Sequence, residues 1–400
     1  MAGTACRQCL PRTSGARREQ VIFLTRGSGS WKSAGQRESF LQVHLVIRRY
    51  RIASPWRRTL KSLRSIPFFL GVLLFLGCAP EERTPTPEPA PTADARWLMS
   101  VLAADSLEGR RAGSEGSRLA ARLIAEQFEL AGLKAVGDSG FFQRVPLRAV
   151  NRAAGRARIR ALSSWAEFDS LPPAERVVET NVIGVMPGSD PELRGEYVLV
   201  TAHFDHVGIG RPVETDSIYN GADDDASGVV GLIEIARALA SVPPGRTVVF
   251  AAMAGEELGL LGTRWYVDHP AVPLAATVAS LNLEMIGRPD TAIGPGRAWL
   301  TGYERTSMGP EFTAAGLAVD PDPRPGQSFY ERSDNIAFAR IGIPAHTLSS
   351  FGLHSDYHSP DDEVERIDFD HLESVIAVAA EAVRLLADGP APEWNPNGQP

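Results

Sequence analysis

The chain contains 400 residues, of which 44% are hydrophobic and 8% aromatic, and its formal net charge is −7. A chain of this length and composition can bury one large α/β core. Its charge is unevenly distributed, because residues 1–77 contain 14 Lys/Arg and 2 Asp/Glu, whereas the remainder contains 27 and 46. So acidic a main body argues against a nucleic-acid partner.

Residues 60–78 have the pattern of an export signal that ends at a cysteine. Lys61 and Arg64 precede an apolar run of 12 residues at 66–77, which is shorter than the about 20 residues that a membrane-spanning helix needs. The run ends in Phe75-Leu76-Gly77-Cys78, which resembles a bacterial lipobox. We therefore expect an exported protein of the bacterial cell envelope, anchored on its periplasmic or outer-membrane face by a lipid on Cys78.

The segments on either side of this signal differ in composition. About sixty residues precede it, whereas an export signal normally begins the chain. No methionine lies between positions 1 and 99, so a later start would use another codon. We expect residues 1–59 to be an extension that results from a start codon assigned too far upstream. Cys6 and Cys9 form an isolated CxxC within it, which is a weak zinc or redox signal. Residues 79–94 are rich in proline and predict an extended linker.

Residues 95–388 predict a single domain built from alternating strands and helices. Apolar runs predict strands near 181–186, 196–202, 246–253, 276–284 and 344–348. Helices are expected within 94–132 and near 226–241, 257–268, 308–316 and 368–387. This alternation indicates an α/β fold, namely a single three-layer α/β/α sandwich with a mixed central sheet. The Pro-rich tail, residues 389–400, is expected to be disordered.

Metal-binding residue types recur where the expected strands end. Glu256 and Glu257 follow the apolar run at 248–255, and two adjacent carboxylates suit metal-assisted hydrolysis, in which one holds a divalent ion and the other takes a proton from water. Four further groups of His, Asp and Glu residues follow or precede expected elements. Taken singly, each could be a helix cap or a hydrogen-bonded histidine. Together they predict a metal site, because ligands converge where strands end. These groups are His203-Phe204-Asp205-His206, Asp223-Asp224-Asp225, Glu284 and the segment 354–362.

Six blocks of the sequence resemble the M28 family of zinc-dependent aminopeptidases and occur in the family's order. The resemblance extends from about Trp97 to about Leu386. It implies the zinc-peptidase/phosphorylase-like fold, a peptide with a free N-terminus as the substrate, and two Zn²⁺ ions, whose ligands Co²⁺ and Mn²⁺ can share. The blocks are residues 202–208, 220–228, 254–262, 281–288, 333–344 and 356–361.

The resemblance also assigns metal ligands. Asp224 would bridge the two zinc ions. One ion would be completed by His203 and Glu284, and the other by Glu257 and His358.

Three further residues would take part in the reaction. Glu256 would be the general base that activates the water shared by the two ions. Asp205 would accept the second ring N–H of His203 and so fix the tautomer of that ligand. Tyr357 would donate a hydrogen bond to the oxyanion of the tetrahedral intermediate. The resemblance also implies a cis peptide bond between Asp224 and Asp225.

Glu284 departs from the family pattern, which usually has aspartate at this position. In distant relatives of the same architecture, glutamate appears in carboxypeptidase-like and acylase-like branches, so a carboxypeptidase or acylase is an open alternative. Glutaminyl cyclase, which has this fold with one metal, is another, and a non-catalytic binding protein is a third. The presence of all five ligands and of Glu256 favours a hydrolase. The sequence predicts neither the preferred side chain nor the oligomeric state.

Overall fold

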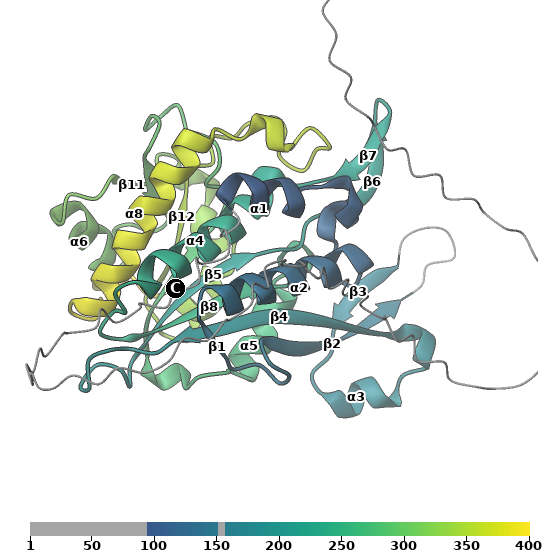
Figure 1. Cartoon of the computed structure of the whole chain (residues 1–400), viewed down its shortest axis with the longest axis horizontal. Helices are drawn as coiled ribbons and strands as arrows, with labels where there is room; N and C mark the ends of the chain where they lie inside the picture. Colours follow the sequence, from purple (N-terminus) through teal and green to yellow (C-terminus); the bar gives the residue numbers. More distant parts are fainter. Residues whose placement is uncertain (1–93, 151–156) are drawn as a thin grey trace, which may run out of the picture. The chain divides into compact units, whose positions relative to one another are not determined.

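The computed structural model describes residues 94–150 and 157–400 of the chain (Figure 1). The expected N-terminal extension, the export signal with Cys78, and nearly all of the expected linker lie outside the described residues. Within the described part, no helix combines the length and the apolar composition that crossing a membrane requires.

A mixed β-sheet forms the centre of the domain, as the sequence predicted. Its strands are β1 (Lys134–Ala135), β2 (Phe142–Val150), β3 (Arg158–Ala161), β4 (Arg176–Met186), β5 (Tyr197–His203), β8 (Thr247–Met253), β9 (Thr277–Leu283), β10 (Ala298–Leu300), β11 (Val319–Pro321) and β12 (Ala345–Ser349). Among the described residues these ten strands have the order β11-β10-β12-β9-β5-β8-β4-β2-β3, with β1 paired to β4. A separate hairpin is formed by β6 (Gly208–Val213) and β7 (Asp216–Tyr219).

The parallel strands of this sheet determine where the candidate site lies. β12, β9, β5 and β8 pair in parallel with their neighbours in this series, so their carboxyl ends lie at one edge of the sheet. These are four of the five strands that the apolar runs predicted. The fifth, β4, pairs antiparallel with β8 and β2 and continues the sheet on one side.

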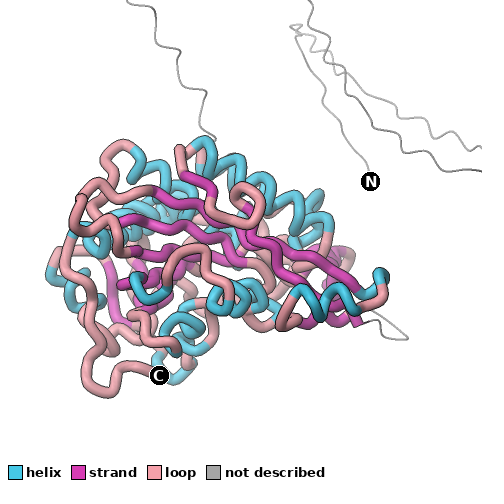
Figure 2. The backbone as a smooth tube through the Cα atoms, turned by 90° about the horizontal axis from the view of Figure 1, so that it is seen from below, coloured by secondary structure: helices cyan, strands magenta, loops and turns pink. Residues whose placement is uncertain are grey.

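Helices cover both faces of the sheet, which completes the three expected layers (Figure 2). They are α1 (Ala95–Leu102), α2 (Glu115–Leu130), α3 (Trp165–Ser170), α4 (Gly228–Ala240), α5 (Leu261–Asp268), α6 (Met308–Ala314), α7 (Asn335–Arg340) and α8 (Phe369–Asp388). Helices α1, α2, α4 and α8 pack on one face, and α5 and α7 pack on the other. The side chains of Asp94, Ser114 and Asp368 cap the N-termini of α1, α2 and α8 by accepting backbone N–H groups.

The sequence of β8 explains why both faces of the sheet are covered. Val248 and Phe250 belong to the apolar cluster that includes α4 and α8, whereas Val249 and Ala251 belong to the cluster on the opposite face. Successive side chains of a strand point to opposite faces, so an uninterrupted apolar run supplies both layers at once. All four of these side chains are fully buried.

The tail, residues 389–400, corrects one expectation, because its prolines do not prevent it from docking on the domain. Trp394 forms an isolated β-bridge with Thr306, and its indole N–H donates to the Gly342 carbonyl at 2.8 Å. The backbone N–H of Asn395 donates to the Arg305 carbonyl at 2.9 Å. A half-buried indole contact and paired backbone groups therefore order a segment whose composition indicated disorder.

Candidate metal centre

The predicted ligands come from separate elements that meet at the carboxyl edge of the parallel strands. His203 is the last residue of β5, Glu257 lies in the 3-10 turn Glu256–Leu258 that follows β8, and Glu284 follows β9. Asp224 lies in the turn Ala222–Ser227 before α4, and His358 lies in the loop between β12 and α8. The expected cis peptide bond between Asp224 and Asp225 is present.

Asp224 lies between two sets of donor atoms. Its Oδ1 is 3.3 Å from Nε2 of His203, and its Oδ2 is 3.1 Å from Nε2 of His358. The carboxylate of Asp362 accepts the backbone N–H of Asp224 at 3.0 Å and that of Asp223 at 3.0 Å, which holds the turn. The two oxygens of one buried carboxylate are thus presented in two directions.

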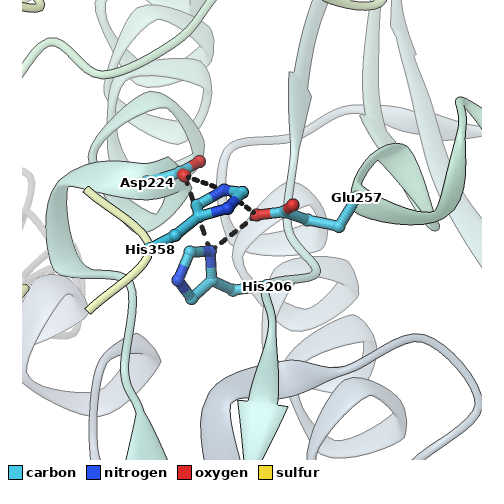
Figure 3. A group of neighbouring side chains, drawn as sticks. All are labelled: His206, Asp224, Glu257 and His358. Atoms are coloured by element: carbon cyan, nitrogen blue, oxygen red, sulfur yellow. Dashed lines mark ion pairs between the residues drawn. The ribbon is translucent and has the colours of Figure 1, made fainter. Parts of the chain in front are cut away.

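Glu257 faces two imidazoles rather than the single one that the resemblance assigned to it (Figure 3). Its Oε1 is 3.0 Å from Nε2 of His358 and 2.9 Å from Nδ1 of His206. The same His206 nitrogen is 3.7 Å from Oδ2 of Asp224. Donor atoms of His206, Asp224, Glu257 and His358 all lie within 4.8 Å of one another. His206 stands three residues after His203 in the quoted motif, but no role had been assigned to it.

The donor atoms of this group fit a divalent cation. Nε2 of His203, Nδ1 of His206, Oδ2 of Asp224 and Oε1 of Glu257 are buried and have no hydrogen-bond partner. Buried polar atoms without a partner are costly, and imidazole nitrogens and carboxylate oxygens that converge in this way are the ligands of zinc. The residues present are therefore suited to hold the metal that the sequence predicted.

Glu284 lies in the same cavity as Glu256, Glu257 and Asp224. Burial raises the pKa of Glu284 to about 7, with the Asp224 carboxylate adding to this effect and His203 opposing it. Its Oε2 also lies 3.5 Å from the amide nitrogen of Asn282. A carboxyl group with this environment favours a cationic partner, because each neighbouring charge except that of His203 disfavours its ionisation.

Asp205 connects His203 to the turn that carries Glu256, but not through the atoms that the resemblance implied. Nδ1 of His203 lies 3.0 Å from the backbone carbonyl oxygen of Asp205 and 4.0 Å from its carboxylate. The carboxylate instead accepts the backbone N–H of Glu256 at 3.0 Å. The backbone carbonyl of Asp205, and not its carboxylate, is therefore the partner of the imidazole. Burial raises the pKa of Asp205 to about 7.

Glu256 is half-buried at the edge of the cavity. Burial raises the pKa of its carboxyl group well above the usual range. His203 opposes this shift, whereas the carboxylates of Glu284, Asp334 and Glu257 add to it. A carboxylate with a raised pKa is a stronger base than one in water, which is the property that proton abstraction needs.

Aromatic side chains line another part of the cavity. The Tyr357 ring lines it and stacks on the imidazole of His358, with ring centroids 4.0 Å apart. Burial raises the pKa of the Tyr357 phenol, so the hydroxyl stays protonated and can donate. The wall beyond it is formed by Met285, Trp299, Phe329 and Phe351. This wall gives the cavity an apolar side.

Arg110 holds two of the ligand-bearing segments together and was not identified from the sequence. Its buried guanidinium donates to the carbonyls of Phe204 at 2.7 Å, Asn220 at 2.6 Å and Gly221 at 2.9 Å. A fourth bond reaches the carbonyl of Leu102 at 2.6 Å. The segment after His203 and the turn before Asp224 are therefore fixed to one side chain. Nothing in the local sequence distinguishes this arginine from a surface one.

Comparisons with known proteins show the family of the chain. The model of a family described as Peptidase family M28 matches residues 181–383. Aminopeptidase YwaD of Bacillus subtilis is 30% identical over 315 residues, which cover 73% of this chain and 64% of that protein. A "Probable zinc metalloprotease" of Pyrenophora teres f. teres is 30% identical over 205 residues, covering 49% and 42%. The chain thus spans roughly two fifths to two thirds of the length of these curated relatives.

A solved structure supports the fold. The zinc aminopeptidase BSAP of Bacillus subtilis superposes with a TM-score of 0.55 at 19% identity, covering 75% of this chain and 97% of that one. At this level of identity the similarity concerns the arrangement of the strands and helices.

Proposed function

Because the chain belongs to peptidase family M28, we propose that it is a di-zinc aminopeptidase that removes the N-terminal residue of peptides. The observation that carries this proposal is the position of Asp224. One of its oxygens faces His203 and the other faces His358 and Glu257, as a carboxylate shared by two ions requires. His203, Asp224 and Glu284 would hold one ion, and Asp224, Glu257 and His358 the other.

Zinc bound there would supply Lewis acidity, polarising the scissile carbonyl and lowering the pKa of the attacking water. Glu256 takes the proton of that water and later returns it to the leaving amine. The main chain of Glu256 is held by its backbone N–H, which donates to the carboxylate of Asp205 at 3.0 Å. Burial raises the pKa of the Glu256 carboxyl group, which makes its carboxylate form a stronger proton acceptor.

Tyr357 would supply a hydrogen-bond donor to the reacting group. Its ring is fixed by stacking on His358 and by a contact with Phe351, whose centroid lies 5.2 Å away. A phenol kept protonated by burial can donate to the oxyanion that develops on the scissile carbonyl. The aromatic wall formed by Trp299, Phe329 and Phe351 would take the side chain of the residue that is removed, with a preference for large apolar ones.

A second candidate function is a carboxypeptidase or acylase on the same scaffold. Besides Glu284, the observation that favours it is Arg332, an exposed guanidinium that lines the cavity. The Cζ atom of this guanidinium lies 5.1 Å from the centroid of the Phe329 ring. An arginine of this kind could bind the terminal carboxylate of a peptide.

The experiment that tests these functions compares matched substrates. The purified protein, with added zinc and with chelator, is given an aminoacyl reporter with a free amine, its N-acetylated twin, and a peptide with a free carboxylate. Metal-dependent cleavage of the free-amine compound alone supports the aminopeptidase. Cleavage of the acetylated compound alone, or release of the C-terminal residue, would replace it with the second candidate.

We also propose that the enzyme is exported and anchored to the bacterial cell envelope by a lipid on Cys78. The support is the order of the segments: a basic and apolar leader, the cysteine, and a Pro-rich stretch before the catalytic domain. In cells, Cys78→Ser should abolish incorporation of labelled fatty acid and release the protein from the membrane fraction. Equal labelling of the two proteins would refute the anchor.

A further inference from the structure

We infer that His206 is a direct ligand of the metal ion held by Glu257 and His358, so that this ion has four protein ligands and the other has three. The inference rests on the di-zinc site proposed above. It adds to that site a residue to which the M28 resemblance assigns no role, and it makes the two metal positions chemically different.

His206 and His358 each direct one ring nitrogen toward the same two carboxylate oxygens (Figure 3). Nδ1 of His206 is 2.9 Å from Oε1 of Glu257 and 3.7 Å from Oδ2 of Asp224. Nε2 of His358 is 3.0 and 3.1 Å from the same two oxygens. Zinc–ligand bonds of about 2.0–2.1 Å in a tetrahedron separate neighbouring donors by about 3.3 Å. The four observed separations lie on both sides of this value.

The burial of His206 indicates that its nitrogen requires a partner. The side chain is inaccessible to solvent. Its Nδ1 faces the carboxylate oxygens of Glu257 and Asp224 without meeting hydrogen-bond geometry to either, and its Nε2 has no hydrogen-bond partner. Oε1 of Glu257 and Oδ2 of Asp224, which face Nδ1, also have none. Leaving several buried polar atoms unpaired in one place is costly. A cation shared by these atoms and by His358 would satisfy them together.

The imidazole ring is also held in a fixed orientation. Gly221, at φ +59°, packs so closely that a Cβ atom on it would lie 2.5 Å from Cγ of His206. From the other side the His206 and His358 rings meet edge to face, with centroids 5.4 Å apart. Backbone on one side and a ligand on the other leave the ring little freedom, which is how a rigid metal site is built.

Four protein ligands have a consequence for the order of binding. Zinc positions with four protein ligands are closed, whereas catalytic positions keep one place free. The position with His206, Asp224, Glu257 and His358 should therefore bind zinc more tightly and fill first. The position with His203, Asp224 and Glu284 is the one with room for water and substrate.

The test is a Zn²⁺ titration of the metal-free full chain, followed by calorimetry and by metal analysis after dialysis. His206→Asn keeps a side-chain nitrogen near the place of Nδ1, able to donate to Glu257, but replaces the imidazole with an amide that binds zinc poorly. We expect the tighter of two binding steps to weaken by more than about 100-fold, beyond the 10–100-fold cost of losing a residue that only orients a ligand. A loss of 100-fold or less would make His206 a positioning residue and overturn the inference.

His354→Asn is the matched control, because His354 contacts Asp223 at 3.0 Å and is not part of the four-residue group. In this variant the tighter zinc-binding step should weaken by no more than about 100-fold. A measurement on the unaltered protein covers the case in which the variant does not fold. The X-ray absorption spectrum of the protein loaded with one equivalent of zinc should show two imidazole ligands on that zinc ion. One imidazole would overturn the inference.

These outcomes are separable from the proposed activity. A tight first zinc with two imidazoles, in a protein that cleaves no peptide substrate, would overturn the aminopeptidase and leave His206 as a ligand. Metal-dependent aminopeptidase activity with one imidazole on the first zinc would support the aminopeptidase and overturn the role of His206 as a ligand.

Discussion

Arg110 donates a hydrogen bond to the backbone carbonyl of Asn220 at 2.6 Å, although 110 residues separate the two in the chain. The same guanidinium bonds the carbonyls of Phe204 and Gly221. It therefore joins the segment that follows His203 to the turn that carries Asp224. The candidate metal centre depends on this connection, because its predicted ligands come from separate segments, and Arg110 joins two of them directly.

Replacing Arg110 with methionine should destabilise the protein strongly. The carbonyls that it bonds would be left without their donor, and the nearby carboxylates of Asp224, Asp225 and Asp205 would lose a buried positive charge. We expect a loss of at least about 3 kcal/mol in the free energy of unfolding. Arg110→Lys keeps the charge with fewer donors, so its loss should be smaller. Urea denaturation, with the exposed Arg122→Met as control, measures both; equal stabilities of Arg110→Met and the control would contradict this role.

Glu256→Gln should separate catalysis from metal binding. The amide cannot accept the proton of the attacking water, so kcat should fall by about 10²- to 10⁴-fold. The fold and the zinc content should be retained, because Glu256 is not among the ligands. Glu257→Ala should instead lose metal, since its Oε1 contacts both His206 and His358. Kinetics with metal analysis distinguishes the two variants, and near-normal turnover by Glu256→Gln would exclude it as the base.

Removal of the metal should lower the thermal stability. The carboxylates of Asp224, Glu256, Glu257 and Glu284 line one cavity, and without a cation their mutual repulsion is uncompensated. Zinc at about 100 times its Kd should stabilise the protein by about 2.7 kcal/mol. Calorimetric scans with chelator and with restored zinc measure the shift. Asp224→Asn should show almost no difference between the two conditions, and an unaltered protein that is insensitive to chelator would rule out the site.

The sequence was sufficient for the elements that carry the site, and the reason is physical. Uninterrupted apolar runs such as that of β8 identify strands buried on both faces, and polar residues directly after them are placed at one edge of the sheet. For this reason the neighbourhood of His203 and Glu257 could be predicted.

The sequence did not predict which atoms of these residues contact one another. The acceptor for His203 is the carbonyl of Asp205 rather than its carboxylate, and which group turns toward the ring depends on loop geometry. His206 was quoted within a motif, but its direction is fixed by contacts with Gly221 and His358, far away in the chain. Long-range contacts of this kind leave no local pattern, and Arg110 is a second example.

The aromatic wall should determine the preferred substrate side chain. Phe329 lies with its ring centroid 5.3 Å from that of Trp299 and 5.9 Å from that of Phe351. Phe329→Ala would remove apolar surface from the pocket, so kcat/KM for leucyl and phenylalanyl reporters should fall about 10- to 200-fold. The alanyl reporter serves as the internal control, because its methyl group does not reach the wall. A uniform loss on all three reporters would indicate a general disturbance of the site.

His346, in β12, should make the stability of the protein dependent on pH. Its Nδ1 lies 2.6 Å from the carbonyl oxygen of Thr301, and its Nε2 lies 2.7 Å from the hydroxyl of Thr306. A neutral imidazole satisfies both groups by donating to the carbonyl and accepting from the hydroxyl. Burial lowers the pKa of His346 from 6.5 to about 4, which keeps the ring in this neutral form.

The sign of the effect follows from which state binds the proton first. As the pH falls below 6.5, the unfolded chain takes up a proton on this histidine while the folded protein does not, so the free energy of unfolding decreases until the pH reaches about 4. The full loss is about 3 kcal/mol. His346→Asn keeps a donor for Thr301 but cannot be protonated in this range. At pH 8 it should be less stable than the unaltered protein, because the Thr306 hydroxyl loses its acceptor.

Between pH 7 and 4 this difference should shrink, since only the unaltered protein pays the cost of keeping His346 neutral. Urea denaturation of both proteins at several pH values isolates the histidine, because acidic groups common to the two affect them alike. A stability difference that stays constant from pH 7 to 4 would mean that His346 is protonated in the folded protein to the same extent as in the unfolded chain.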